Sequence, residues 1–308
     1  MPRAVKFSRY GGSDVLEVVD VDQPHPGPGE VVVRVVAAAT NPGEMMIREG
    51  AFANVWPAMF PEGQGNDFSG RVAEVGPGEA GFSPGDEVMG FTPRAAQADY
   101  VRSASDRLAR KPPSVPWEVA AAIPGAGATA YAAVRAVRPR PGETVVVSAA
   151  AGGVGVVAAQ LARLAGARVI GTAGDANAAF LRSLGVEPVR YGDGLLERIQ
   201  SLAPDGVDAY LDNFGAGNVD LAIKLGVAPD RINTIIDGAA ASRYGAHSDA
   251  QEQADSPPVW EELAQLVAAG ELTIPIQSVY PLERVRDAYD ELAARHTRGK
   301  IVLRVNPD

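Results

Sequence analysis

A glycine-rich turn is the part of this sequence whose residue types and spacing most directly suggest chemistry. Ala150-Ala151-Gly152-Gly153-Val154-Gly155 follows the apolar run Thr144–Ser148 and precedes an alanine-rich segment with helical spacing. It matches the pattern G-x-G-x-x-G with alanine at the first position. Gly152 would let the backbone approach a pyrophosphate, and Gly155 would let the following helix pack closely and point its amides at the negative charge. The strand before it and the helix after it favour dinucleotide binding over a turn that serves packing alone.

The residues after the next predicted strand bear on which dinucleotide would bind. Asp175 stands about twenty residues beyond the glycines, where a carboxylate usually accepts the ribose hydroxyls of NAD. However, the predicted strand Arg168–Thr172 puts Ala173 at its end, so Asp175 falls in the loop, where it would serve as a helix N-cap. Without an acid at the strand end there is room for a 2′-phosphate. We therefore predict NADPH as the cofactor.

The elements that must hold this turn change in character along the chain. Residues 1–120 contain β-branched runs separated by Gly and Pro, which indicates a β-rich domain. In residues 121–271 strands alternate with helical segments, which predicts an α/β fold with a doubly wound parallel sheet. The expected strands are Val31–Ala38, Gly70–Gly76, Asp86–Phe91, Thr144–Ser148, Arg168–Thr172, Pro188–Tyr191, Val207–Asp212, Arg231–Ile236, Ile274–Tyr280 and Ile301–Val305.

Composition limits the partners and the location of the protein. Its 308 residues include no cysteine, so disulfides and thiolate zinc sites are excluded. The formal net charge of −10 argues against a nucleic-acid surface, because phosphate binding needs clustered cations. Apolar runs such as Val31–Ala39 are too short to span a bilayer, and no basic-then-apolar leader is recognised. We expect a cytoplasmic protein that binds neither nucleic acid nor membrane.

Further motifs occur in an order and at a spacing that point to one family. They are Asn41-Pro42, Asn66-Asp67-Phe68-Ser69-Gly70-Arg71-Val72, Pro84-Gly85-Asp86-Glu87-Val88, Pro124 to Thr129-Ala130, the glycine turn (residues 150–155), Val207-Asp208 to Leu211-Asp212, and Gly299-Lys300-Ile301-Val302-Leu303. Over nearly its whole length the chain resembles the zinc-free medium-chain reductases, the quinone oxidoreductase-like group of the alcohol dehydrogenase superfamily. The resemblance implies a GroES-like, β-rich catalytic domain at 1–120 and 272–308, a Rossmann domain at 121–271, and a homodimer.

The resemblance also implies hydride chemistry without a metal. Zinc-dependent relatives carry a cysteine and a histidine as catalytic ligands, and the matching positions here are Asn41 and Asn66, neither of which binds zinc well. What remains is hydride transfer from NADPH to a quinone or an α,β-unsaturated carbonyl. Negative charge then builds on oxygen and needs a donor or a proton. Asn41 is the first candidate donor, and Thr129 matches a family threonine near the nicotinamide. Turn chemistry before proline and a helix-start cap are the alternatives.

Cofactor contacts are predicted from the same likeness. Tyr191 matches a tyrosine beside the adenosine phosphate, and Lys300 matches a position close to the cofactor. Their alternatives are strand-end packing and a solvated lysine. The predicted contacts are Ala151, Gly152, Gly153, Val154, Gly155, Thr172, Asn177, Tyr191, Asn213, Ile236 and Lys300.

The chain departs from the family pattern in two places. A tyrosine found in many quinone reductases is Met46 here, and a thioether cannot donate a hydrogen bond. The loop after Thr172 lacks the usual basic residue and serine. Asp175 in that loop would repel a 2′-phosphate unless Arg182 or Arg190 compensates.

Other residues leave alternatives open. Tyr244 or His247 is a candidate proton donor, although an exposed loop residue is the plainer interpretation of His247. Trp56, Met59 and Phe60 suggest either an apolar substrate wall or core packing. The alternative functions are an enoyl-thioester or biosynthetic tailoring reductase and a non-catalytic NADPH-binding sensor or crystallin-like protein.

Overall fold

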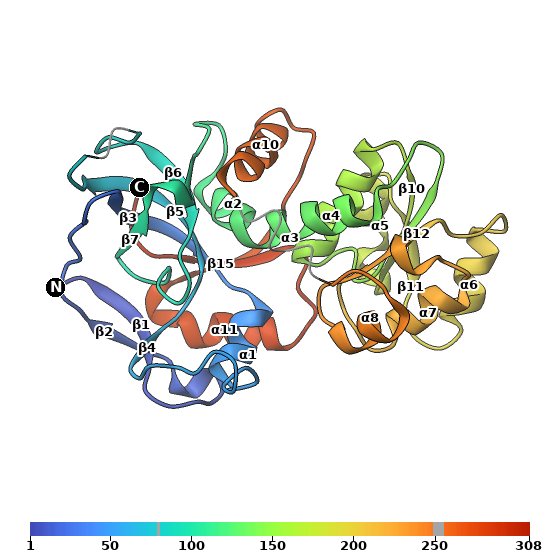
Figure 1. Ribbon diagram of the computed structural model, residues 1–308, viewed down its shortest axis with the longest axis horizontal. Coiled ribbons are helices and arrows are strands. Elements are labelled where there is room, and N and C mark those ends of the chain that lie inside the picture. Colours follow the sequence, from blue (N-terminus) through green and yellow to red (C-terminus); the bar gives the residue numbers. More distant parts are fainter. Residues whose placement is uncertain (79–80, 249–255) are drawn as a thin grey trace. The chain divides into compact units, whose positions relative to one another are not determined.

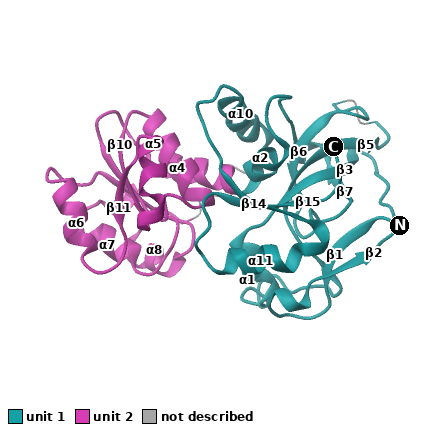
Figure 2. Cartoon of the chain, turned by 180° about the vertical axis from the view of Figure 1, so that it is seen from behind, with its two compact units in different colours: residues 1–125, 256–308 teal, residues 126–255 magenta. Residues whose placement is uncertain are grey.

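The computed structural model describes residues 1–78, 81–248 and 256–308 (Figure 1). The chain forms two compact units: residues 1–125 with 256–308 make unit 1, and residues 126–255 make unit 2 (Figure 2). Within the described residues no helix combines the length and the apolar composition that crossing a bilayer requires.

Unit 1 is rich in β-structure. Its strands are β1 (Arg3–Phe7), β2 (Glu17–Asp20), β3 (Glu30–Ala39), β4 (Glu62–Gly63), β5 (Asp67–Val75), β6 (Glu87–Phe91), β7 (Tyr100–Ala104), β8 (Leu108–Arg110), β14 (Ile276–Pro281) and β15 (Lys300–Arg304). Its helices are α1 (Pro42–Arg48), α2 (Trp117–Ala122), α10 (Pro257–Ala268) and α11 (Val285–Ala293). The larger sheet has the order β14-β15-β3-β5-β6-β8, with β7 paired to β3, and the smaller sheet has the order β2-β1-β4.

Strand β3 runs through the core of unit 1. Its residues from Val31 to Ala39 are buried apart from Arg34, as expected for a β-branched run covered on both faces. The last strand, β15, pairs antiparallel with it, and Val302 lies opposite Ala39. The C-terminal residues therefore complete a sheet that begins near the N-terminus.

Unit 2 contains one parallel sheet with helices between its strands. The strands are β9 (Thr144–Val147), β10 (Arg168–Ala173), β11 (Glu187–Arg190), β12 (Ala209–Asp212) and β13 (Ile232–Thr234). The helices are α3 (Ala128–Val137), α4 (Gly153–Leu164), α5 (Ala178–Ser183), α6 (Leu195–Leu202), α7 (Asn218–Lys224) and α8 (Gly238–Tyr244). The strand order β11-β10-β9-β12-β13 confirms the doubly wound parallel sheet that the alternating pattern predicts.

Helix α10 is placed differently from the sequence-based division. The predicted boundary at residue 271 assigns it to the dinucleotide-binding domain, whereas it belongs to unit 1 in the structure. Trp260 and Leu263 on this helix are buried, and the helix packs against β8. An apolar helix face indicates burial but does not identify the sheet that covers it, so periodicity could not decide this point.

Candidate functional site

Apart from Lys300, which lies in unit 1, the residues predicted to contact the cofactor lie at one edge of the sheet of unit 2. Neighbouring strands are parallel throughout, so their carboxyl ends share this edge. The glycine turn follows β9, Thr172 and Asn177 lie at and beyond the end of β10, and Tyr191, Asn213 and Ile236 follow β11, β12 and β13. The strand order reverses between β9 and β12, which is the switch point at which doubly wound sheets bind ligands.

The neighbouring strand holds the glycine turn in a tight shape. Ala149 has a φ of +47°, in the left-handed region. Its backbone N–H donates to Thr172 Oγ1 at 3.1 Å, and the N–H of Ala150 donates to the Thr172 carbonyl at 3.0 Å. A Cβ at Gly155 would lie 2.2 Å from the Ala149 carbonyl oxygen. Gly155 therefore serves close packing, and the group it packs against is the turn itself.

Gly152 is less tightly enclosed than Gly155. A Cβ there would meet only the Ala149 carbonyl oxygen, at 3.3 Å. As the N-cap of α4, Gly152 has no side chain that could pair with the amides of the first helical turn. At the same edge, the buried Asn213 Oδ1 has no hydrogen-bond partner among the described residues. The uncapped amides at the start of α4 and the acceptor of Asn213 fit a dinucleotide whose pyrophosphate lies at the start of α4.

Asp212 holds the switch point together and is not among the predicted site residues. Its buried carboxylate accepts hydrogen bonds from Ser148 Oγ at 2.9 Å and from Thr234 Oγ1 at 2.8 Å. The backbone N–H groups of Phe214 and Gly215 donate to it at 3.0 and 2.9 Å. One side chain thus ties the ends of β9, β12 and β13. The only sequence signal was an acid at the end of an apolar strand.

Asn41 lies at the centre of a polar cluster in unit 1. It is the N-cap of α1, and its Oδ1 accepts a hydrogen bond from Lys300 Nζ at 2.6 Å. Its Nδ2 donates to Glu44 Oε1 at 3.0 Å and to both carboxylate oxygens of Asp67 at 3.1 Å. Lys300 Nζ also donates to the Thr40 carbonyl at 2.7 Å. The structure thus joins two predicted site residues, and Lys300 is buried rather than solvated.

Glu44 accepts hydrogen bonds from several groups in and around this cluster. Its Oε2 accepts from the Tyr289 hydroxyl at 2.6 Å and from the Asn41 N–H at 3.0 Å, and its Oε1 accepts from the Asn66 N–H at 3.0 Å. Burial raises the pKa of Glu44, which hydrogen bonds from Tyr289 and Asn41 and the charge of Lys300 partly offset. Burial and the neighbouring Glu44 raise the pKa of Tyr289, so its hydroxyl keeps the proton that it donates.

Sequence reasoning missed both Glu44 and Tyr289. The spacing Asn41-x-x-Glu44 is of the capping-box type and was a usable signal for the acid. Tyr289 had no local signal, because its partner is 245 residues away along the chain.

Four ionisable side chains are buried together in this cluster. Glu44 and Asp67 are acids, and Lys300 and Arg48 are bases. The Arg48 guanidinium carbon lies 4.8 Å from the centroid of the Tyr289 ring, and burial lowers the pKa of Arg48. Burial also lowers the pKa of Lys300, against the opposing charges of Asp67 and Glu44. Buried charges are tolerated when opposite charges lie close by, so each member depends on the others.

The two positions that match zinc ligands do not fit a zinc site. Asn41 Oδ1 accepts from Lys300, whose ammonium would repel a cation. Asn66 Oδ1 accepts from the backbone N–H of Arg94 at 3.0 Å. Both amide oxygens are therefore used within the protein, and zinc sites are built from thiolate, imidazole and carboxylate donors.

Three other candidate residues, Thr129, Tyr244 and His247, lie in unit 2. Thr129 is buried and is the second residue of α3, so it is not the helix-start cap that was its alternative. The Tyr244 hydroxyl donates to Asp220 Oδ1 at 2.6 Å. His247 Nε2 lies 3.1 Å from the Asp230 carbonyl oxygen. The partners in these contacts, Asp220 and Asp230, do not belong to the glycine turn.

The aromatic and methionine residues of the possible substrate wall lie in unit 1. The side chains of Trp56, Met59 and Phe60 are exposed. The Phe60 ring still packs against the buried Phe7 ring, with 5.9 Å between the ring centroids, so exposure argues against core packing only for Trp56 and Met59.

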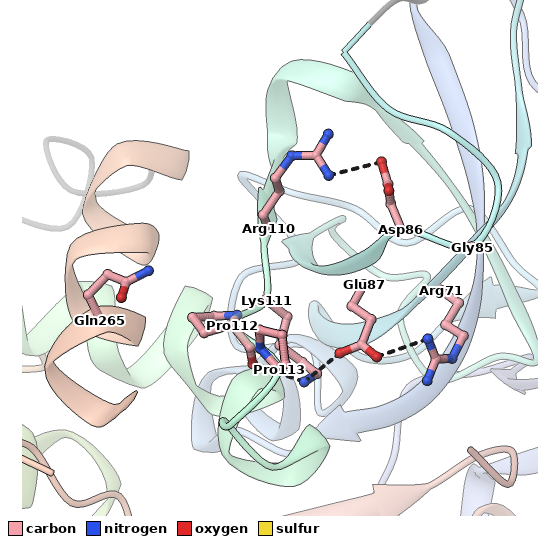
Figure 3. A pocket seen from close by; sticks show the side chains of 9 residues that line it. All are labelled: Arg71, Gly85, Asp86, Glu87, Arg110, Lys111, Pro112, Pro113 and Gln265. Carbon is pink, nitrogen blue, oxygen red and sulfur yellow. Dashed lines mark hydrogen bonds and ion pairs between the residues drawn. The ribbon is translucent and has the colours of Figure 1, made fainter. Parts of the chain in front are cut away.

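A pocket in unit 1 is lined by charged side chains (Figure 3). Arg110 pairs with Asp86 at 3.0 Å, and Glu87 pairs with Arg71 at 2.9 Å and with Lys111 at 2.8 Å. Each cation that lines this pocket thus has a carboxylate partner. The lining includes none of the predicted site residues.

Comparison with known proteins gives consistent relatives. Residues 27–141 match the alcohol dehydrogenase GroES-like domain, and residues 184–303 match the family described as zinc-binding dehydrogenase. A quinone oxidoreductase from Pseudomonas aeruginosa is 30% identical, over 98% of this chain and 99% of the relative. The solved CurK enoyl reductase is 25% identical with a TM-score of 0.87, over 99% of both chains. A mycobacterial protein solved with NADPH is 26% identical with a TM-score of 0.86, over 98% of this chain and 100% of that one.

Proposed function

The chain belongs to the quinone oxidoreductase-like group of the medium-chain dehydrogenase/reductase family, and on this premise we propose that it is an NADPH-dependent reductase. The proposed acceptor is a quinone or an α,β-unsaturated carbonyl, and the proposed reaction uses no metal. The family is one of oxidoreductases that act on small molecules. The single observation that carries the proposal is the switch-point edge of unit 2, where the glycine turn leaves the first amides of α4 without a side-chain cap.

Support for a dinucleotide comes from this edge, and support for NADPH comes from one relative. The amides at the start of α4 would hold the pyrophosphate, and Asn213 Oδ1 would accept a further hydrogen bond from a dinucleotide bound at this edge. The mycobacterial structure with a similar fold holds NADPH. A bound dinucleotide supplies the hydride.

The protein's own contribution is to stabilise negative charge on the acceptor oxygen. We assign this role to the Nδ2 group of Asn41, and Thr129 of unit 2 stays a predicted site residue. Lys300 donates to Asn41 Oδ1, which polarises the amide and strengthens its N–H donors. Because Glu44 and Asp67 hold Nδ2 from the other side, the amide has one fixed orientation. Both N–H groups of Nδ2 already donate to carboxylates, so a substrate oxygen would have to replace one of these acceptors.

Binding and turnover test this proposal separately. We expect NADPH fluorescence to change on titration with the purified protein, and NADPH to bind more tightly than NADH. We expect NADPH absorbance to fall when a quinone or an enone from a small panel is added. Absence of binding would remove the cofactor assignment. Binding without oxidation by any member of the panel would favour a sensor.

An enoyl-thioester reductase is the second candidate. It is favoured by the likeness to the CurK enoyl reductase and by Met46, which leaves an apolar group where many quinone reductases have a tyrosine. We expect a comparison of kcat/KM between enoyl thioesters and free quinones to separate the two. A clear preference for the thioester would replace the quinone assignment and leave the hydride chemistry unchanged.

A further inference from the structure

Two opposite charges face each other at the ends of β10 and β11, on the carboxyl edge of unit 2. Arg190 is the last residue of β11 and lies beside Ala173, the last residue of β10. Asp175 follows two residues after that strand end. Its Oδ2 lies 3.3 Å from Nη1 of Arg190. The N-cap of α5 is Asn177, so Asp175 does not occupy the N-cap position of this helix.

An aromatic side chain borders this pair. Tyr191 follows Arg190 and has 52% of its surface exposed. A Cβ placed on Gly174 would lie 3.5 Å from the Tyr191 hydroxyl oxygen and 3.7 Å from its Cε1. The ring thus lies against the chain between Ala173 and Asp175. The strand end presents a cation, a carboxylate and a phenol hydroxyl side by side.

The ion pair is weak enough for an anion to open it. The Arg190 and Asp175 side chains are 69% and 74% exposed, and exposed pairs contribute little to stability. A phosphate monoester carries a charge of about −1.5 to −2 near pH 7, more than one carboxylate. A guanidinium can also donate two parallel hydrogen bonds to a phosphate. A phosphate at this strand end therefore draws Arg190 away from Asp175.

The neighbouring arginines do not compete for this role. The Arg198 guanidinium donates to the carbonyls of Arg190, Gly192 and Asp193 at 2.7–3.2 Å, so it fixes the loop after β11. Arg182 lies in the last turn of α5, which leads away from the carboxyl edge. Of Arg182, Arg190 and Arg198, only Arg190 has its guanidinium at the strand end beside Asp175.

We propose that Arg190 recognises the 2′-phosphate of NADPH and that Asp175 is its counter-charge, so that this pair sets the choice between NADPH and NADH. The inference rests on the proposed function and adds a selection rule to it. Without a 2′-phosphate, Asp175 accepts a hydrogen bond from the 2′-hydroxyl. Arg190 thus favours NADPH and Asp175 favours NADH, so the preference for NADPH is moderate.

Dissociation constants for both dinucleotides test this rule in the full chain, without turnover. We expect Arg190→Gln to weaken NADPH binding about tenfold or more and to leave NADH within about twofold, because a charge-assisted pair of hydrogen bonds is lost for one ligand only. We expect Asp175→Asn to tighten NADPH several-fold and to weaken NADH. Arg182→Gln removes the same charge at the far end of α5, and we expect it to change neither constant. Adenosine 2′,5′-bisphosphate should compete with NADPH in the unaltered protein and lose affinity in Arg190→Gln.

The possible failures are distinguishable. If the unaltered protein binds neither dinucleotide, both the proposed function and this rule are wrong. If it binds both, but Arg190→Gln weakens them equally or Arg182→Gln has the same effect, only the rule is wrong. Circular dichroism of the variants checks that they fold, which the exposure of both side chains leads us to expect.

Discussion

Replacing Lys300 with methionine is expected to lower the free energy of unfolding of unit 1 by about 3–5 kcal/mol, the usual cost of removing one partner from a buried ion pair. Lys300 is buried, and its Nζ donates to Asn41 Oδ1 and to the Thr40 carbonyl. Methionine leaves Glu44 and Asp67 with less compensating charge. Urea unfolding followed by tryptophan fluorescence measures this directly, because all three tryptophans lie in unit 1.

A matched control and a pH series make this test specific. Lys6→Met removes a partly exposed lysine from the same unit, and we expect a change within about 0.5 kcal/mol. The pKa of Glu44 is already raised by burial, and loss of Lys300 raises it further. The deficit of Lys300→Met should be smallest below the unfolded pKa of about 4.3 and should grow as pH rises through the raised folded value. A deficit that is small, or equal at all pH values, would contradict the paired-charge account.

Gly155→Ala is expected to abolish tight dinucleotide binding and to destabilise unit 2 by about 1–3 kcal/mol, the usual range for overpacking. The new Cβ would lie 2.2 Å from the Ala149 carbonyl oxygen and 2.8 Å from its carbon. This carbonyl cannot move freely, since it accepts from the Gly152 N–H at 2.9 Å and the Ala149 N–H is bound to Thr172. NADPH titration and thermal unfolding by circular dichroism measure the two effects.

Gly152→Ala is the matched control for this second test. Its Cβ meets only one atom, the Ala149 carbonyl oxygen at 3.3 Å rather than 2.2 Å, so we expect unit 2 to lose less stability than in Gly155→Ala. We expect NADPH binding to weaken nonetheless, because the methyl group occupies the space left for the pyrophosphate. Unchanged NADPH affinity in both variants would show that the phosphates do not lie at the glycine turn.

Local patterns in the sequence determined the scaffold. Alternating apolar and turn residues located β3, β9 and β10, and the glycine turn was recognised between a strand and a helix. These features depend on residues two to four positions apart, so they can be recognised from the sequence without the tertiary structure. The doubly wound order followed because strands alternated with helices. The grouping of α10 with unit 1 could not be derived in this way, since its apolar face fits either unit.

Tertiary structure alone decided the chemistry around Asn41 and Arg190. Lys300 reaches Asn41 across 259 residues, and this contact exists because β15 pairs with β3. Because of this contact, Lys300 is a buried charge and not the solvated lysine of the alternative interpretation. In the same way, the parallel register of β10 and β11 selected Arg190 over Arg182 as the partner of Asp175. Spacing along the chain predicts which residues share a face of one element. Only the packing of elements fixes which charges meet, and their burial then sets how strongly they interact.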